Sequence, residues 1–145
     1  MKDVESATEL ALSMKAVAQK FDCDFTALIT DMNQPLGNKV GHSLEIIESI
    51  ETLKDNGPED LTEISIELAA HMIKQAGLAD SLEHAKQKAR ESIENGSALE
   101  EFAKLIKRQG GNEKVIEDYS LLPLAKEKTF ITSLLYTSPS PRDRG

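Results

Sequence analysis

The residues best suited to chemistry lie between Ala27 and Leu53. A loop expected over 31–42 contains a proline and two glycines, which let the backbone turn sharply and leave carbonyl oxygens free to point at a ligand. On the helix expected next, Glu45 and Glu48 are three positions apart and share a face. A carboxylate beside loop carbonyls is an all-oxygen environment that suits an alkali or alkaline-earth cation. The alternative is that Glu48 is one of many solvated helix glutamates.

The elements around this loop are expected to position it. The segment 24–30 (DFTALIT) is apolar and bounded by polar residues, which predicts a buried strand ending where the loop begins. Ligands of open α/β sheets bind at the carboxyl ends of strands, so the loop would cross a favourable edge. Capping residues and helical periodicity predict helices over 3–20, 43–54, 58–76, 80–95 and 97–109, and a further strand could start at 128–132. The sequence therefore predicts an α/β fold, rich in helix, with one clear buried strand.

Charge and composition exclude several partners. The net charge is −8, and Lys and Arg are scattered rather than clustered, so we expect no nucleic-acid partner. No apolar run approaches the length of a membrane span, and the first residues do not resemble a signal peptide, so we expect a cytoplasmic protein without a membrane partner. His42, His71 and His84 have no nucleophile or carboxylate at a recognisable spacing and are expected on the surface or at a rim.

The C-terminal residues differ in character from everything before them. Residues 134–143 (LLYTSPSPRD) match one reading frame of a transposon-based sequencing adapter. The alternative is a natural tail rich in Ser and Pro. We therefore expect a partial α/β domain over 1–132 and a non-native, disordered tail over 133–145.

The stretch 27–53 (ALITDMNQPLGNKVGHSLEIIESIETL) closely resembles a segment of the pyrimidine-nucleoside and thymidine phosphorylase family. GPEDLTE at 57–63 and QGGN at 109–112 resemble it too, so the likeness runs from Met1 to about Leu124 but covers only part of a family chain. His42 departs from the pattern, because the family usually has Asn there. Since His caps a helix poorly, Ser43 is expected to provide the cap.

This resemblance implies a potassium ion held by two carbonyls of the loop and one glutamate of the helix. The matching positions are the backbone oxygens of Leu36 and Lys39 and the side chain of Glu48. The rest of the shell would come from a glycine-rich phosphate loop upstream. Met1 matches a methionine that contacts the pyrimidine base, unless it is merely the start of a truncated reading frame.

The resemblance also implies the fold and the activity. The chain would be an internal fragment of the large α/β domain of a nucleoside phosphorylase that is a homodimer and acts in pyrimidine-nucleoside salvage. The enzyme would transfer the pentose of thymidine, uridine or deoxyuridine to phosphate, releasing the free base. The phosphate cradle, the base-binding cations and the dimer domain lie upstream in the family, so the chain alone is expected to be inactive. Alternatives are an enzyme like anthranilate phosphoribosyltransferase and a non-enzymatic helical interaction module.

Overall fold

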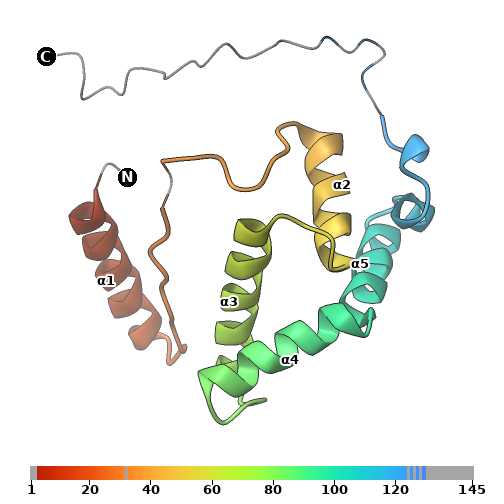
Figure 1. Cartoon of the computed structure of the whole chain (residues 1–145). Helices are drawn as coiled ribbons and strands as arrows, with labels where there is room; N and C mark the ends of the chain where they lie inside the picture. The colour runs from red at the N-terminus through yellow and green to blue at the C-terminus, as the bar shows by residue number, and fades with distance from the viewer. Residues whose placement is uncertain (1–2, 32, 124, 126, 128, 130–145) are drawn as a thin grey trace, which may run out of the picture.

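A computed structural model describes residues 3–31, 33–123, 125, 127 and 129. Its helical elements follow the predicted order closely (Figure 1). They are α1 (Val4–Lys20), α2 (His42–Leu53), α3 (Glu59–Gln75), α4 (Leu82–Glu94), α5 (Ser97–Arg108) and the 3-10 turns η1 (Glu113–Ile116) and η2 (Tyr119–Leu121). The prediction of a helix-rich chain with five α-helices is therefore confirmed for this part of the chain.

The prediction of an α/β fold with a buried strand is wrong. Throughout the described residues the structure contains no strand, and 24–30 follows an irregular path beside α1. The segment is not buried either, because Phe25 and Leu28 are only partly covered and Ile29 is 48% exposed. The physical reason is that a strand exists only when its backbone N–H and C=O groups pair with a neighbouring strand. Most of 128–132, where a further strand was expected, lies outside the described residues.

The core is formed mainly where α3 packs on α4. Ile66 and Ala70 of α3 and Ala85 and Ala89 of α4 are buried, and each pair is four positions apart, on one face of its helix. The small alanines allow the two helix backbones to approach closely. An ion pair between the Lys86 ammonium and the Glu67 carboxylate, 2.7 Å apart, joins the same two helices at the surface.

Helix α2 is held from the far end of the described chain. Its Ile50 is fully buried. At the start of α2, the Ser43 hydroxyl donates a hydrogen bond of 2.6 Å to the carbonyl of Pro123. At the other end, the Tyr119 hydroxyl donates to Glu51, and the Lys54 ammonium lies 3.1 Å from the same hydroxyl oxygen. We call these contacts between α2 and residues 119–123 the clasp, because they fix both ends of the helix.

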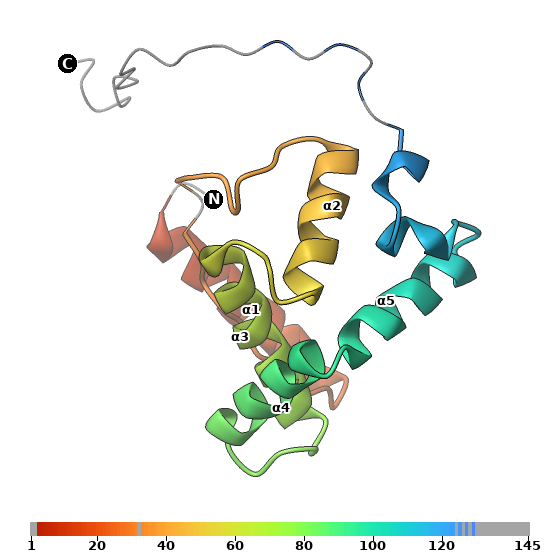
Figure 2. The same cartoon turned by 45° about the vertical axis from the view of Figure 1, so that its right-hand side comes forward.

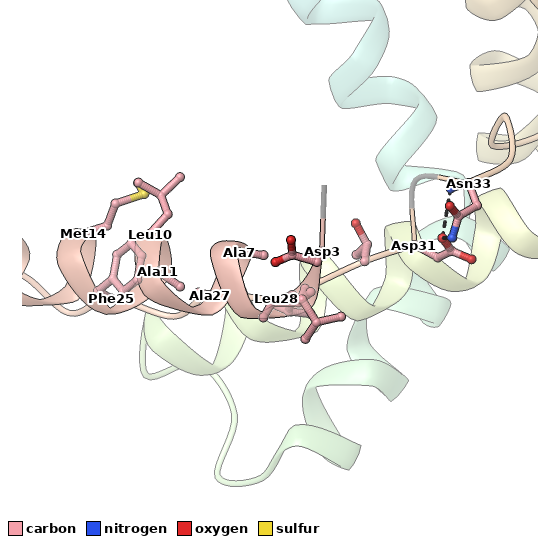
Figure 3. A pocket seen from close by; sticks show the side chains of 13 residues that line it. Asp3, Ala7, Leu10, Ala11, Met14, Phe25, Ala27, Leu28, Asp31 and Asn33 are labelled. Carbon is pink, nitrogen blue, oxygen red and sulfur yellow. Dashed lines mark hydrogen bonds between the residues drawn. The ribbon is translucent and has the colours of Figure 1, made fainter. Parts of the chain in front are cut away.

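Helix α1 lies at one side of the molecule in Figure 1, and in the turned view of Figure 2 it runs behind α3. Its apolar residues recur at helical spacing, yet Leu10, Met14 and Phe21 are 45%, 51% and 74% exposed. Leu10 and Met14 line an open hollow of about 640 Å³ between α1 and residues of 25–31 together with Asn33. Figure 3 shows Leu10 and Met14 beside Phe25 in this hollow.

Candidate functional site

The candidate site is the loop over 35–41, which lies against the side of α2. Glu48 of α2 is only 7% exposed. Its two carboxylate oxygens accept hydrogen bonds from the loop backbone, Oε1 from the Asn38 N–H at 2.9 Å and Oε2 from the Lys39 N–H at 3.3 Å. A buried carboxylate needs such donors, because without them its desolvation would be strongly unfavourable. Glu48 is therefore no solvated helix glutamate, and it organises the loop.

Gly37 is the residue that lets the loop approach Glu48 so closely. Its φ is +71°, in the left-handed region that favours glycine. A Cβ at this position would also collide with Oε2 of Glu48. Both observations favour a glycine at this position, which gives a physical reason for the glycine of the QPLG motif.

Two further carboxylates hold the loop backbone. Glu45 of α2 accepts the Gly41 N–H through its Oε1 at 2.8 Å. Asp60, in the first turn of α3, accepts the Gly37 N–H through its Oδ2 at 3.0 Å. Glu45 could be suspected from its spacing to Glu48. Asp60 could not, because it lies 23 positions from Gly37, and only its place in the GPEDLTE motif marked it.

The start of α2 differs from the prediction in one respect. The helix begins at His42 with Gly41 as its N-cap, and no side chain caps it by a hydrogen bond. Ser43 was expected to cap the helix, but its hydroxyl is used by the bond to Pro123 instead. The bond from the Gly41 N–H to Glu45 satisfies one of the free backbone donors at this end.

The three residues predicted to hold potassium, Leu36, Lys39 and Glu48, lie in this loop and in α2. The other ligands of the ion were expected from a phosphate loop outside the chain. Leu36 is 48% exposed and the Lys39 side chain is exposed. Within the described ranges no group of three or more His, Cys, Asp or Glu side chains could hold a metal ion. A cation here would depend on backbone carbonyls together with Glu48.

The chemistry of these donors fits a potassium ion. A carboxylate has about four acceptor positions, so Glu48 keeps acceptor capacity beyond its two backbone bonds. All the candidate ligands are oxygens, which a hard cation prefers. The assignment of Leu36, Lys39 and Glu48 stays a prediction, and Met1, the predicted base contact, lies outside the described residues.

The histidines are placed largely as expected, with one correction. His42 and His84 are exposed and His71 is partly buried. His71 was expected to lack a carboxylate partner, but its Nε2 lies 3.4 Å from Glu67, one helical turn away. The Lys86 ammonium is closer to Glu67 and is the main reason why the pKa of the Glu67 carboxyl is lowered. We interpret this group as a surface cluster that joins α3 and α4.

Comparison with known proteins identifies the class. The family model described as "Glycosyl transferase family, a/b domain" matches residues 2–99, and the chain belongs to this family. Among curated proteins, the chain is 44% identical over 125 residues to the pyrimidine-nucleoside phosphorylase of Staphylococcus haemolyticus and 43% identical over 125 residues to that of Bacillus subtilis. Each alignment covers 86% of this chain and 29% of the relative.

The pyrimidine-nucleoside phosphorylase of Staphylococcus aureus is similar to the same extent, with 44% identity over 126 residues. The chain thus spans about 29% of the length of the curated relatives it matches. The resemblance predicted from the TDMNQPLG loop is confirmed. In the described part of the chain, no helix is long and apolar enough to cross a membrane.

Proposed function

We propose that this chain is a segment of a pyrimidine-nucleoside phosphorylase. In the reaction, a phosphate oxygen attacks the anomeric carbon of the nucleoside, the bond from that carbon to the base nitrogen breaks, and a pentose 1-phosphate and the free pyrimidine form. Thymidine, uridine and deoxyuridine are the proposed substrates. The observation that supports this most is the QPLG loop, organised by the buried Glu48, inside a region 43–44% identical to proteins named for this activity.

The segment's own contribution is a preformed oxygen surface. We infer that the carbonyls of Leu36 and Lys39 and the carboxylate of Glu48 hold a potassium ion. When bound, the ion supplies a fixed positive charge beside the phosphate-binding region. Glu48 keeps the loop in place before any ion arrives, because its bonds to the Asn38 and Lys39 N–H groups do not depend on the ion. This preorganisation lowers the entropic cost of ion binding.

The remaining machinery belongs to the complete protein. We propose that the phosphate cradle, the cations that bind the base and the dimer-forming domain lie in sequence that accompanies this segment. Met1 is the proposed contact to the pyrimidine. A cytoplasmic homodimer is the proposed form of the enzyme.

Two measurements test the proposal. The purified chain alone should show no phosphorolysis of thymidine or uridine, because the proposal assigns the phosphate-binding and base-binding cations to sequence outside it. A chimera in which this chain replaces the matching segment of the Bacillus subtilis relative should catalyse the phosphorolysis of uridine or thymidine at a rate within about tenfold of the parent enzyme. Turnover by the isolated chain above a heat-killed control would contradict the fragment interpretation. A chimera that folds, by circular dichroism and melting, yet is inactive would contradict the proposed function.

A further inference from the structure

The Leu36–Gly37 peptide is held by a residue outside the loop and outside α2. Its N–H donates to Oδ2 of Asp60 at 3.0 Å, while Oδ1 of the same carboxylate accepts the Leu61 N–H at 2.8 Å. Both oxygens of Asp60 are thus engaged with backbone donors, one in the loop and one in α3. Asp60 is therefore a bridge between the loop and the first turn of α3.

This bond fixes the direction of a carbonyl that matters for the proposed function. In a planar trans peptide the N–H and the C=O point in opposite directions. The Gly37 N–H and the Leu36 C=O belong to the same peptide group, so aiming the N–H at Asp60 aims the Leu36 oxygen away from α3. The Leu36 oxygen is one of the two proposed backbone ligands.

The other carboxylates control different peptides. Glu48 binds the N–H groups of Asn38 and Lys39, which belong to the peptides whose carbonyls come from Gly37 and Asn38. Glu45 binds the Gly41 N–H, in the peptide that carries the Val40 carbonyl. Among these four backbone bonds, only the bond to Asp60 sets the orientation of a proposed ligand carbonyl.

We propose that Asp60 is a positioning residue for the cation site, acting through the Leu36–Gly37 peptide. The inference rests on the proposed function, because it assigns a purpose to a carbonyl that the function uses. Asp60 would not touch the ion, since its carboxylate lies on the N–H side of the peptide. The simpler reading is that Asp60 is only a favourable negative charge at the start of α3.

A matched neighbour separates the two readings. Glu59 lies in the same first turn of α3, is exposed and carries the same charge. Glu59→Gln and Asp60→Asn remove one charge each from that turn, but only the second alters the bond to Gly37. Asp60→Asn keeps an oxygen acceptor of similar reach, whereas Asp60→Ala removes the acceptor.

The first measurement uses the full chain, labelled with ¹⁵N, and follows hydrogen exchange of the Gly37 amide by NMR. Asp60→Ala should speed exchange at Gly37 about tenfold, consistent with loss of a hydrogen bond to a charged acceptor. Asp60→Asn should restore most of the protection, and Glu59→Gln should leave exchange at Gly37 unchanged. Amides of Asn38 and Lys39, held by Glu48, report whether the loop as a whole stays folded. Unchanged exchange at Gly37 in Asp60→Ala would overturn the inference.

The second measurement uses the chimera and potassium chloride, with ionic strength held constant by choline chloride. Asp60→Ala should raise the potassium concentration for half-maximal activity several-fold, and Asp60→Asn should raise it less. If Glu48→Gln raises this concentration and Asp60→Ala does not, the inference fails while the proposed cation site stands. If neither variant changes the potassium dependence, the cation site itself is wrong and the inference falls with it.

Discussion

Two glycines with the same backbone conformation allow the contact between the loop and Glu48 to be measured. Gly37 and Gly77 both have a φ of +71°, but a Cβ at Gly77 would meet nothing within 4 Å, whereas a Cβ at Gly37 would collide with Glu48. Gly77→Ala should therefore lower the free energy of unfolding by the left-handed penalty alone, about 1–2 kcal/mol. Gly37→Ala carries the same penalty and must also displace the Glu48 carboxylate.

The additional cost can be worked from the two bonds that would be lost. Hydrogen bonds to charged groups contribute about 1.5–3 kcal/mol each, but the loop N–H groups regain water when released, so we discount the pair to about 1–3 kcal/mol. Gly37→Ala should thus destabilise the chain by about 2–5 kcal/mol. Urea unfolding followed by far-ultraviolet circular dichroism gives the global value. Amide exchange over 37–41 gives the local value if the loop opens separately.

A double-mutant cycle tests the assigned cause. In a Glu48→Ala background the obstacle is gone, so Gly37→Ala should cost no more than Gly77→Ala does. The reasoning is refuted if the two glycine substitutions cost the same in the natural background. It is equally refuted if the excess cost at Gly37 persists without Glu48.

Three further outcomes are expected. In the chimera, Glu48→Gln should raise the apparent KM for phosphate several-fold before it raises the apparent KM for the nucleoside. Lys39→Ala should change activity little, because only the Lys39 backbone carbonyl is used. If Glu48→Gln has the potassium dependence of the natural sequence while Lys39→Ala is nearly inactive, the lysine ammonium binds phosphate instead. The hydrogen bond from Tyr119 is the main cause that holds the pKa of the Glu51 carboxyl below its ordinary value of 4.5. A lowered pKa stabilises the fold at pH values above the pKa of the unfolded chain, and this stability is lost as the pH falls through the pKa of the folded chain. Tyr119→Phe should therefore lower the melting temperature by about 2–6 °C at pH 7, with the difference shrinking below about pH 4.5, and a pH-independent difference would argue against this bond as the cause. A chain ending at residue 118 should show faster amide exchange throughout α2 than the full chain, and equal protection would mean that the clasp contributes nothing.

The helices were predictable because their signals are local. Asp3 was expected to cap the first helix, and its carboxylate accepts the Ser6 N–H at 2.7 Å. For the helix predicted over 80–95 the cap lies one residue after the predicted start, since Ser81 accepts the His84 N–H. Capping and periodicity involve residues within one or two turns, so sequence alone contains the information needed.

The larger errors concern interactions between residues far apart in sequence. The segment 24–30 has the composition of a strand, but composition cannot supply the neighbour that a strand must pair with. The Asp60 carboxylate accepts the Gly37 N–H across 23 positions, and the spacing of Asp60 to the loop does not predict this bond. The loop's importance was recognised through resemblance, whereas the carboxylates that shape it became visible only in three dimensions.

The clasp has a consequence for the order of events during folding. Ser43 is joined to Pro123 across 80 positions and Glu51 to Tyr119 across 68. The contacts at both ends of α2 therefore cannot form until residues 119–123 have been synthesised. Closing loops of this length has a large entropic cost that must be met before the contacts form, which makes such steps late and slow. During synthesis on the ribosome, α3 and α4 can pack against each other before α2 forms its contacts with residues 119–123. The loop held by Glu48 is thus expected to reach its final shape only after residues 119–123 have fixed α2, and later than the α3–α4 pair.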